Sequence, residues 1–290
     1  MHYQSYQSVS EYLMDVEAFL LLNEVKNNLP LGILYKIEEK NKNSREDAPL
    51  LGRITAAGEN ILLTIMTPPR DLVIAGSSQA DPAQLKEAVN LAAAELSSPA
   101  RCLYLPGVLG EKPLAEAFRD AWVSRTGLDS KLAMEQRIFK LEKVKPVQKS
   151  PGKLRPARAA ELDLLTDWYI NFCQESLNQD PSEKESRESL EKAIQETRLY
   201  CWEIEDRPVC SVSKSRILKT TAAIAFVYTP KDMRKQGYAT SAVAELSQKI
   251  LEEGYQSCCL FTDLANPTSN SIYRRIGYHP VCDFNLYKFT

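Results

Sequence analysis

Residues 222–240 read Ala-Ala-Ile-Ala-Phe-Val-Tyr-Thr-Pro-Lys-Asp-Met-Arg-Lys-Gln-Gly-Tyr-Ala-Thr, and three kinds of local structure can be predicted from them. The run up to Tyr228 is apolar throughout, which is typical of a strand buried on both faces in the middle of a sheet. From Tyr238 onward, small and apolar residues recur at helical spacing until Gly254, which predicts a helix over 238–253. The basic segment between them therefore joins a strand to a helix N-terminus.

This basic segment has the composition of a phosphate-binding loop. Backbone N–H groups in the first turn of a helix have no intrahelical acceptor and carry partial positive charge, so they bind phosphate readily. Gly237 and Ala239 would let a diphosphate approach the main chain, and Arg234 and Lys235 add formal positive charge. The alternative interpretation is a solvated loop that only caps a helix.

A second motif covers residues 263–278. Asn266 suits the position before a helix and Pro267 the first helical position, which predicts a helix over 267–276. Ser269 and Tyr273 are four residues apart and share one face of that helix. Tyr273 could therefore face a cleft, where its phenol, with a reference pKa of about 10, could give a proton to a departing thiolate. The alternative interpretation is a core tyrosine.

The two motifs together resemble those of the GNAT superfamily of acyl-CoA-dependent N-acetyltransferases. The resemblance lies in Arg234-x-x-Gly237-x-Ala239 after an apolar strand and in the downstream Asn266 and Tyr273. The resemblance covers residues 151–290. It implies an α/β (α+β) fold with a mixed, mostly antiparallel sheet and flanking helices. It also implies that acetyl-CoA is the co-substrate and that no metal is needed.

The resemblance also implies a role for each residue of the two motifs. Main-chain groups of the strand end would contact the pantetheine arm, at Val227, Tyr228 and Thr229. The loop and the helix start would hold the diphosphate, through Arg234, Lys235, Gln236, Gly237, Tyr238, Ala239 and Thr240. Asn266 and Ser269 would contact the cofactor as well. Tyr273 would lie beside the thioester sulfur as the general acid.

The general base is left open by the same comparison. Many members of the superfamily carry a glutamate on the strand before the phosphate loop, whereas residues 220–229 contain no carboxylate. Amine deprotonation could then pass through water to Asp263, Glu203 or Glu205. The alternative interpretation of each is an ordinary surface carboxylate, which is the more common role of such a residue.

The chain is predicted to divide near residue 150, because residues 139–156 are charged, rich in proline and without periodicity. After the division we expect two helices, three strands, a helix, a strand, a helix and a strand. Before it, patterns predict helices over 9–28, 82–96 and 113–125, and strands over 52–57, 61–67, 71–75, 101–105 and 133–141. Residues 107–112 are interpreted as a turn. We therefore expect a degenerate GNAT-like domain at 1–145, lacking the phosphate element, and an acetyl-CoA-binding domain at 151–290.

Composition excludes several classes of protein. The 290 residues include 36 Lys and Arg against 38 Asp and Glu, a formal charge of −2, so a nucleic-acid partner is not expected. Mean hydropathy is −0.32 and neither a membrane span nor a secretory signal is visible, so we expect no membrane partner and a cytoplasmic location. With two histidines and no Cys-x-x-Cys pair, the chain has too few ligands for a zinc site and too few residues for a Cys-His or Ser-His nucleophile. Most of the seven cysteines lie in apolar runs and are predicted to be buried thiols, namely Cys102, Cys201, Cys210, Cys258 and Cys259.

The resulting hypothesis is an N-acetyltransferase that moves an acetyl group directly from acetyl-CoA to a primary amine on a small molecule or peptide. The sequence identifies neither the acceptor nor the oligomeric state. One alternative is a sensor that binds acyl-CoA without catalysis. The other is a protein-interaction module built on two similar domains.

Overall fold

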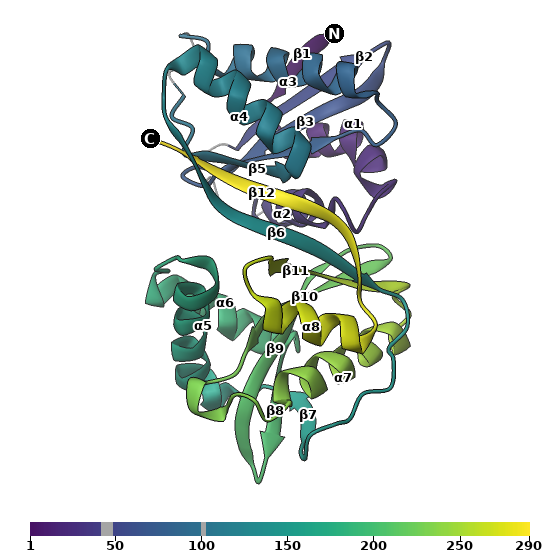
Figure 1. The fold of residues 1–290 in the computed structure, drawn as a ribbon, viewed down its shortest axis with the longest axis vertical. Helices are drawn as coiled ribbons and strands as arrows, with labels where there is room; N and C mark the ends of the chain where they lie inside the picture. Colours follow the sequence, from purple (N-terminus) through teal and green to yellow (C-terminus); the bar gives the residue numbers. More distant parts are fainter. Residues whose placement is uncertain (42–48, 100–102) are drawn as a thin grey trace. The chain divides into compact units, whose positions relative to one another are not determined.

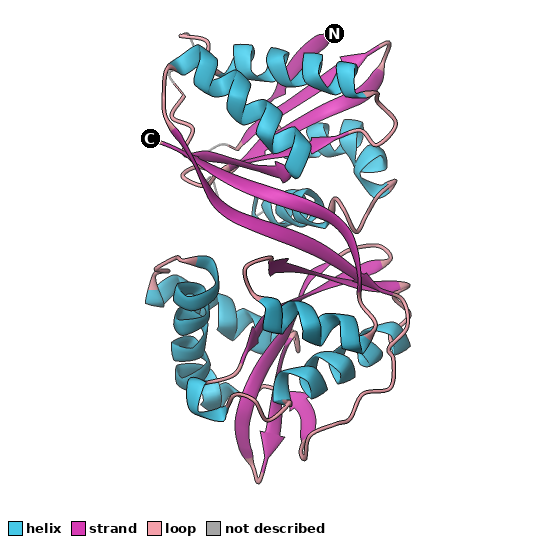
Figure 2. Cartoon of the chain, viewed as in Figure 1, coloured by secondary structure: helices cyan, strands magenta, loops and turns pink. Residues whose placement is uncertain are grey.

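The computed structural model describes residues 1–41, 49–99 and 103–290, and its internal contacts divide the chain into two units (Figure 1). Unit 1 consists of Met1–Ile138 with Val281–Thr290, and unit 2 consists of Phe139–Pro280. Each unit has a sheet with helices packed on it (Figure 2). The mixed, mostly antiparallel α/β fold predicted from the sequence is confirmed.

Unit 1 contains a mixed sheet. Its strands follow one another in the order β1 (His2–Tyr6), β2 (Leu50–Ala56), β3 (Glu59–Met66), β4 (Leu72–Gly76), β5 (Gly107–Glu111), β12 (His279–Phe289) and β6 (Ser130–Leu141). Strand β5 is parallel to β4, and β12 is antiparallel to β5. The helices are α1 (Val9–Leu21), α2 (Asn28–Asn41), α3 (Pro82–Leu96) and α4 (Lys112–Thr126). Small residues of α3 and the aromatic rings of Phe118 and Trp122 on α4 fill one core.

Several predictions for this unit were wrong. Strand β1 and helix α2 were not predicted, and the helix expected over 9–28 already ends at Leu21. The strand expected over 101–105 lies at Gly107–Glu111 instead, where a turn was expected. Its glycines are strand residues because a Cβ at Gly110 would lie 2.5 Å from Ile74 Cγ1, so a neighbouring strand approaches too closely for a side chain. Arg101 and Cys102 lie outside the described residues.

Unit 2 carries the predicted phosphate loop. Its strands follow the order β11 (Ser257–Asp263), β10 (Thr221–Tyr228), β9 (Arg207–Ile217), β8 (Leu199–Ile204) and β7 (Lys153–Pro156). Strand β10 is parallel to β11 and antiparallel to β9, so the apolar run identified in the sequence is a central strand, as predicted. Strand β7 was not predicted. The helices are α5 (Leu162–Leu177), α6 (Glu183–Gln195), α7 (Tyr238–Glu252) and α8 (Pro267–Ile276), with short 3-10 turns η1 (Ala159–Glu161) and η2 (Lys231–Met233).

Helices cover both faces of the unit 2 sheet. On β8, Leu199 and Cys201 pack in one core with α5 and α6, while the alternating Tyr200 and Trp202 pack in another with α7 and α8. Cys201, Cys210, Cys258 and Cys259 are buried free thiols, as predicted. None of the helices in the described ranges has the length and apolar character that crossing a membrane requires.

The segment interpreted as an exposed connector is attached to unit 2. Val144 and Val147 pack against the core that contains α7. Trp202 Nε1 donates a hydrogen bond to Pro151 O at 2.9 Å. A Cβ at Gly152 would lie 2.4 Å from Glu203 O, and this residue has a φ of +116°. Both the close contact and the backbone conformation therefore require glycine at this position. Sequence periodicity could not show these contacts, because residues 142–152 have no regular secondary structure.

Candidate active site

Strands β10 and β11 diverge at the end of β10 that leads to the loop. Their parallel pairing runs only from Thr221–Ser257 to Ala223–Cys259, although β10 continues to Tyr228 and β11 to Asp263. A β-bulge follows, since Ala225 pairs with Ser213 and Tyr228 with Ser211, which leaves one extra residue on β10. Val227, Tyr228 and Thr229 therefore lie beyond the last paired residues of the two strands, where an extended ligand could contact their main chain.

The loop after β10 turns sharply into α7. Lys235 and Gly237 both have left-handed backbone conformations, with φ of +67° and +79°. A Cβ at Gly237 would lie 2.7 Å from Ser150 Oγ. Glycine is thus required at this position both by its backbone conformation and by the close approach of another segment.

The N-terminus of α7 has no side-chain cap. Four helices begin with a side chain that accepts a first-turn N–H, and the capping residues are Ser8 for α1, Asp81 for α3, Ser182 for α6 and Asn266 for α8. Helix α7 begins at Gly237 without such a bond, as α4 and α5 also begin without one, so its first N–H groups have no side-chain acceptor in the described part of the chain. An anion could bind there.

The N-terminus of the corresponding helix in unit 1 is capped by a carboxylate of the chain itself. Helix α3 follows β4 as α7 follows β10, but Asp81 Oδ1 accepts the Gln84 N–H at 2.8 Å and Gln84 Oε1 accepts the Asp81 N–H at 3.2 Å. A carboxylate at a helix N-terminus satisfies the amides and repels a second anion. The first-turn amides of α3 are therefore capped within the chain itself, unlike those of α7.

Two residues that sequence reasoning missed support the loop. Ser150 N–H donates to Ser241 Oγ at 2.8 Å, and Ser150 Oγ donates to Gln236 O at 2.6 Å. Glu175 on α5 accepts from Arg234 Nη2 at 2.7 Å. Nothing in the local sequence distinguishes Ser150 in a polar segment or Glu175 on a polar helix end.

The second motif forms the start of α8, as predicted. Asn266 Oδ1 accepts the Ser269 N–H at 3.0 Å, which brings these two predicted residues together. Asn270 Nδ2 donates to Asp263 O at 3.0 Å and to Asn266 O at 2.7 Å, so it ties the end of β11 to the helix.

Tyr273 lies on α8 and is largely buried, with 7% of its surface exposed. Its ring packs against Phe139 and Tyr278, with centroids 6.3 and 5.9 Å away. Burial, and secondarily the neighbouring Cys210, raises the pKa of Tyr273, so the phenol keeps its proton at neutral pH. Burial also raises the pKa of the Cys210 thiol to about 12.

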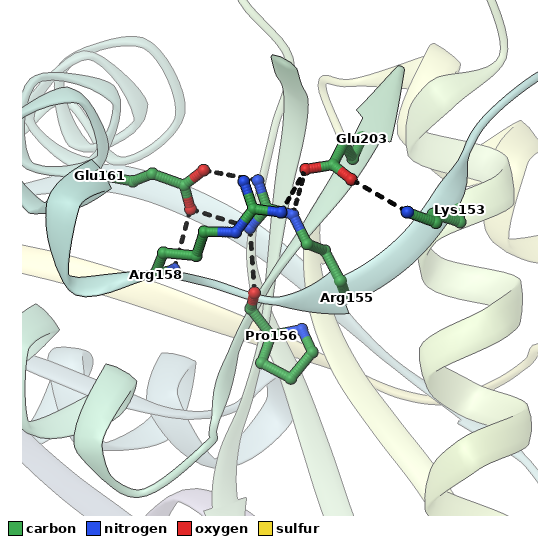
Figure 3. Close-up of polar contacts among 6 residues, drawn as sticks. All are labelled: Lys153, Arg155, Pro156, Arg158, Glu161 and Glu203. Carbon is green, nitrogen blue, oxygen red and sulfur yellow. Dashed lines mark hydrogen bonds and ion pairs between the residues drawn. The ribbon is translucent and has the colours of Figure 1, made fainter. Parts of the chain in front are cut away.

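The three carboxylates considered as bases lie in different settings, and Figure 3 shows the contacts of one of them, Glu203. The buried Glu203 is hydrogen-bonded to Arg155 Nε and lies 3.1 Å from Arg158 Nη2 and 3.4 Å from Lys153 Nζ. The hydrogen bond from Arg155 is the main reason that the pKa of Glu203 is lowered. Glu205 lies in the exposed turn between β8 and β9. Asp263 ends β11, and its Oδ1 accepts the Ala265 N–H at 2.8 Å.

Glu203 therefore serves as a counter-ion in a network that attaches η1 to the sheet. Arg155 also binds Glu161, with Nη2 2.5 Å from Oε1 and Nη1 2.9 Å from Oε2. A carboxylate held by two arginines has low basicity, in line with the lowered pKa of Glu203. Of the three candidates, Asp263 is the one at the end of a strand that borders the divergence.

No metal site was expected. The described ranges contain no group of three or more His, Cys, Asp or Glu side chains that could hold a metal ion.

Comparisons with known proteins agree with this geometry. Residues 207–285 match the family described as FR47-like protein, which is related to the GNAT superfamily. A GNAT-family acetyltransferase from Colwellia psychrerythraea has a TM-score of 0.61 at 10% identity, over 100% of this chain and 99% of that one. A GCN5-related N-acetyltransferase from Sphaerobacter thermophilus has a TM-score of 0.60 at 11% identity, over 99% of this chain and 95% of that one. A Drosophila protein reaches 0.65 at 12% identity, over 99% of this chain and 98% of that one.

These identities are too low to transfer an activity, but they show that the fold is shared over the whole chain. The search of curated proteins finds no match. The predicted resemblance to the GNAT superfamily is confirmed at the level of the fold.

Proposed function

We propose that this chain, which has the GNAT fold over its whole length, is an N-acetyltransferase that transfers an acetyl group from acetyl-CoA to a primary amine. The observation that carries the proposal is the uncapped N-terminus of α7, which directly follows a basic loop and a strand that diverges from its parallel neighbour. A coenzyme A molecule needs both features, an anion site for the diphosphate and free main-chain groups for the pantetheine.

The residues around the divergence fit such a ligand. Gly237 keeps a side chain away from the helix N-terminus, and Arg234 and Lys235 supply positive charge there. Asn270 Oδ1 is buried and has no hydrogen-bond partner among the residues that the structure describes. Because buried polar atoms normally have partners, this oxygen is consistent with a contact to a ligand.

We assign the following roles in the reaction. Main-chain groups of Val227 to Thr229 position the thioester, and a main-chain N–H of the same segment stabilises its carbonyl oxygen. Tyr273 gives its proton to the departing sulfur. Proton transfer from a tyrosine to a thiolate with an ordinary pKa of about 8.5 is uphill. The proposed step therefore relies on the position of the phenol beside the sulfur rather than on a favourable difference in pKa.

Amine deprotonation is assigned to Asp263 through water. The assignment follows from the strand end that Asp263 occupies and from the ion pairs that hold Glu203. The acceptor is a small molecule or a peptide with a primary amine.

The test combines binding and turnover. Calorimetry with acetyl-CoA measures the binding, and a thiol-release assay over a panel of primary amines measures the transfer. Release of free thiol with at least one amine supports the proposal. Wild-type protein that fails to bind acetyl-CoA would refute it and would favour the interaction module.

A non-catalytic acyl-CoA sensor is the second candidate. It is favoured by the lack of a carboxylate on residues 220–229 and by the ion pairs that occupy Glu203. Binding of acetyl-CoA without thiol release on every amine would support the sensor.

A further inference from the structure

The carboxylate of Glu175 lies against the phosphate loop. Glu175 is in the last turn of α5, and its Oε2 accepts from Arg234 Nη2 at 2.7 Å. Its Oε1 lies 3.7 Å from Lys231 Nζ and accepts from the Tyr228 hydroxyl at 3.4 Å. One carboxylate therefore contacts two cations of the loop and the last residue of β10.

These contacts hold Arg234 toward β10 and α5. Arg234 Nε donates to Thr229 O at 2.9 Å, and its guanidinium lies 5.7 Å from the centre of the Tyr228 ring. The side chains of Arg234 and Glu175 are 41% and 26% exposed, so a ligand from solution can reach the pair. An exposed pair of this kind is weak enough for a competing anion to break.

The charge balance favours competition. Residues 231–235 carry three cations and the carboxylate of Asp232, a net charge of +2, and Glu175 reduces it to +1. A diphosphate diester brings two negative charges and several acceptor oxygens to the same loop. It can replace the Glu175 carboxylate on Arg234, whereas an uncharged thioester has nothing to offer these cations.

We infer that Glu175 is a built-in competitor that sets the affinity of the site for diphosphate-bearing ligands and promotes release of coenzyme A. The inference rests on the proposed function of this site. Glu175 occupies Arg234 and Lys231 in the free protein, yields them when a diphosphate binds, and takes them back as the ligand leaves. The residue thus weakens the binding of acetyl-CoA and of coenzyme A without touching the thioester end.

The test replaces Glu175 by glutamine, which keeps the side-chain shape and a hydrogen-bond acceptor but removes the charge. Calorimetry on the full chain uses coenzyme A and, as the ligand without a diphosphate, pantetheine. E175Q should bind coenzyme A about two- to fivefold more tightly, the range expected for an exposed ion pair. Its affinity for pantetheine should equal that of the wild type. The gain should shrink in high salt.

Two further variants separate competition from general effects. D167N removes an exposed charge from the same helix, and Asp167 lies away from the loop contacts described above, so its affinity for coenzyme A should stay at the wild-type value. The gain from E175Q should shrink when Arg234 is also replaced by glutamine, because Glu175 then keeps, of its contacts with the two loop cations, only the one with Lys231 at 3.7 Å.

Weaker coenzyme A binding by E175Q would overturn the inference, because Glu175 would then position Arg234 for the ligand. An unchanged affinity, or an equal change for pantetheine, would overturn it as well. A wild-type protein that binds no coenzyme A would refute the proposed function instead, so the two failures are distinguishable.

Discussion

Replacing Tyr273 by phenylalanine tests the proposed acid directly, because it removes one oxygen and keeps the ring. The ring contacts with Phe139 and Tyr278 remain, and the side chain is buried within a packed core. A shape-conserving core substitution of this kind costs less than about 1.5 kcal/mol in the free energy of unfolding. The variant should therefore fold, with acetyl-CoA affinity close to the wild-type value.

The expected loss of turnover can be bounded. A positioned general acid contributes roughly 10²- to 10⁴-fold, which corresponds to about 2.7–5.4 kcal/mol at about 1.36 kcal/mol per factor of ten. Burial raises the pKa of Tyr273, which makes it a weaker acid and favours the lower end of the range. We expect kcat to fall by about 10²-fold.

The assay is thiol release at saturating acetyl-CoA, accompanied by calorimetric measurement of acetyl-CoA binding and by thermal unfolding. Tyr278→Phe is the matched control, since Tyr278 is also buried beside Tyr273 but hydrogen-bonds to Ser247 within the core. An unchanged kcat in the Tyr273 variant would refute the assigned role. An equal loss in both variants would show that the effect is one of packing.

Three further predictions follow from the loop, the buried ion pairs and the strand end. Gly237→Ala should lower the free energy of unfolding by about 1–2 kcal/mol, because the backbone at this position is left-handed. It should also weaken acetyl-CoA binding, because the added Cβ would lie 2.7 Å from Ser150 Oγ and disturb the loop. Unchanged binding in calorimetry would contradict the role of the loop. Folding lowers the pKa of Glu203, so its ionised form stabilises the folded state. This stabilisation is fully present above the pKa of the unfolded chain, about 4.3, and is lost as the pH falls through the pKa of the folded state. Urea unfolding should be measured from about pH 6 to about pH 3, a range that brackets the usual glutamate pKa of about 4.3. The stability of the wild type should fall more steeply over this range than the stability of Glu203→Gln. Parallel curves would argue against the network. Asp263→Asn should reduce turnover with little effect on acetyl-CoA affinity, and unchanged thiol release across pH would remove Asp263 as the base.

The sequence alone was sufficient for the elements that carry a periodic or capping signal. The apolar run that became β10, the helix that begins after Gly237 and the helix capped by Asn266 were predicted almost to the residue. Their signals are local, since strand burial, helix spacing and caps each depend on a few neighbouring residues. The same local patterns carried the resemblance to the GNAT superfamily.

The remaining features depended on contacts between segments distant in sequence. The glycines of β5 have the sequence pattern of a turn, but they lie in a strand where Gly110 packs against Ile74. The segment before β7 has the composition of a free connector, but its Ser150 is hydrogen-bonded to the loop before α7. Glu175 and Arg234 are 59 positions apart, and Glu203 lies 48 positions from Arg155, so no window of sequence contains either pair. Which carboxylate is held in ion pairs is an electrostatic property of the folded chain, and only the tertiary structure decided it.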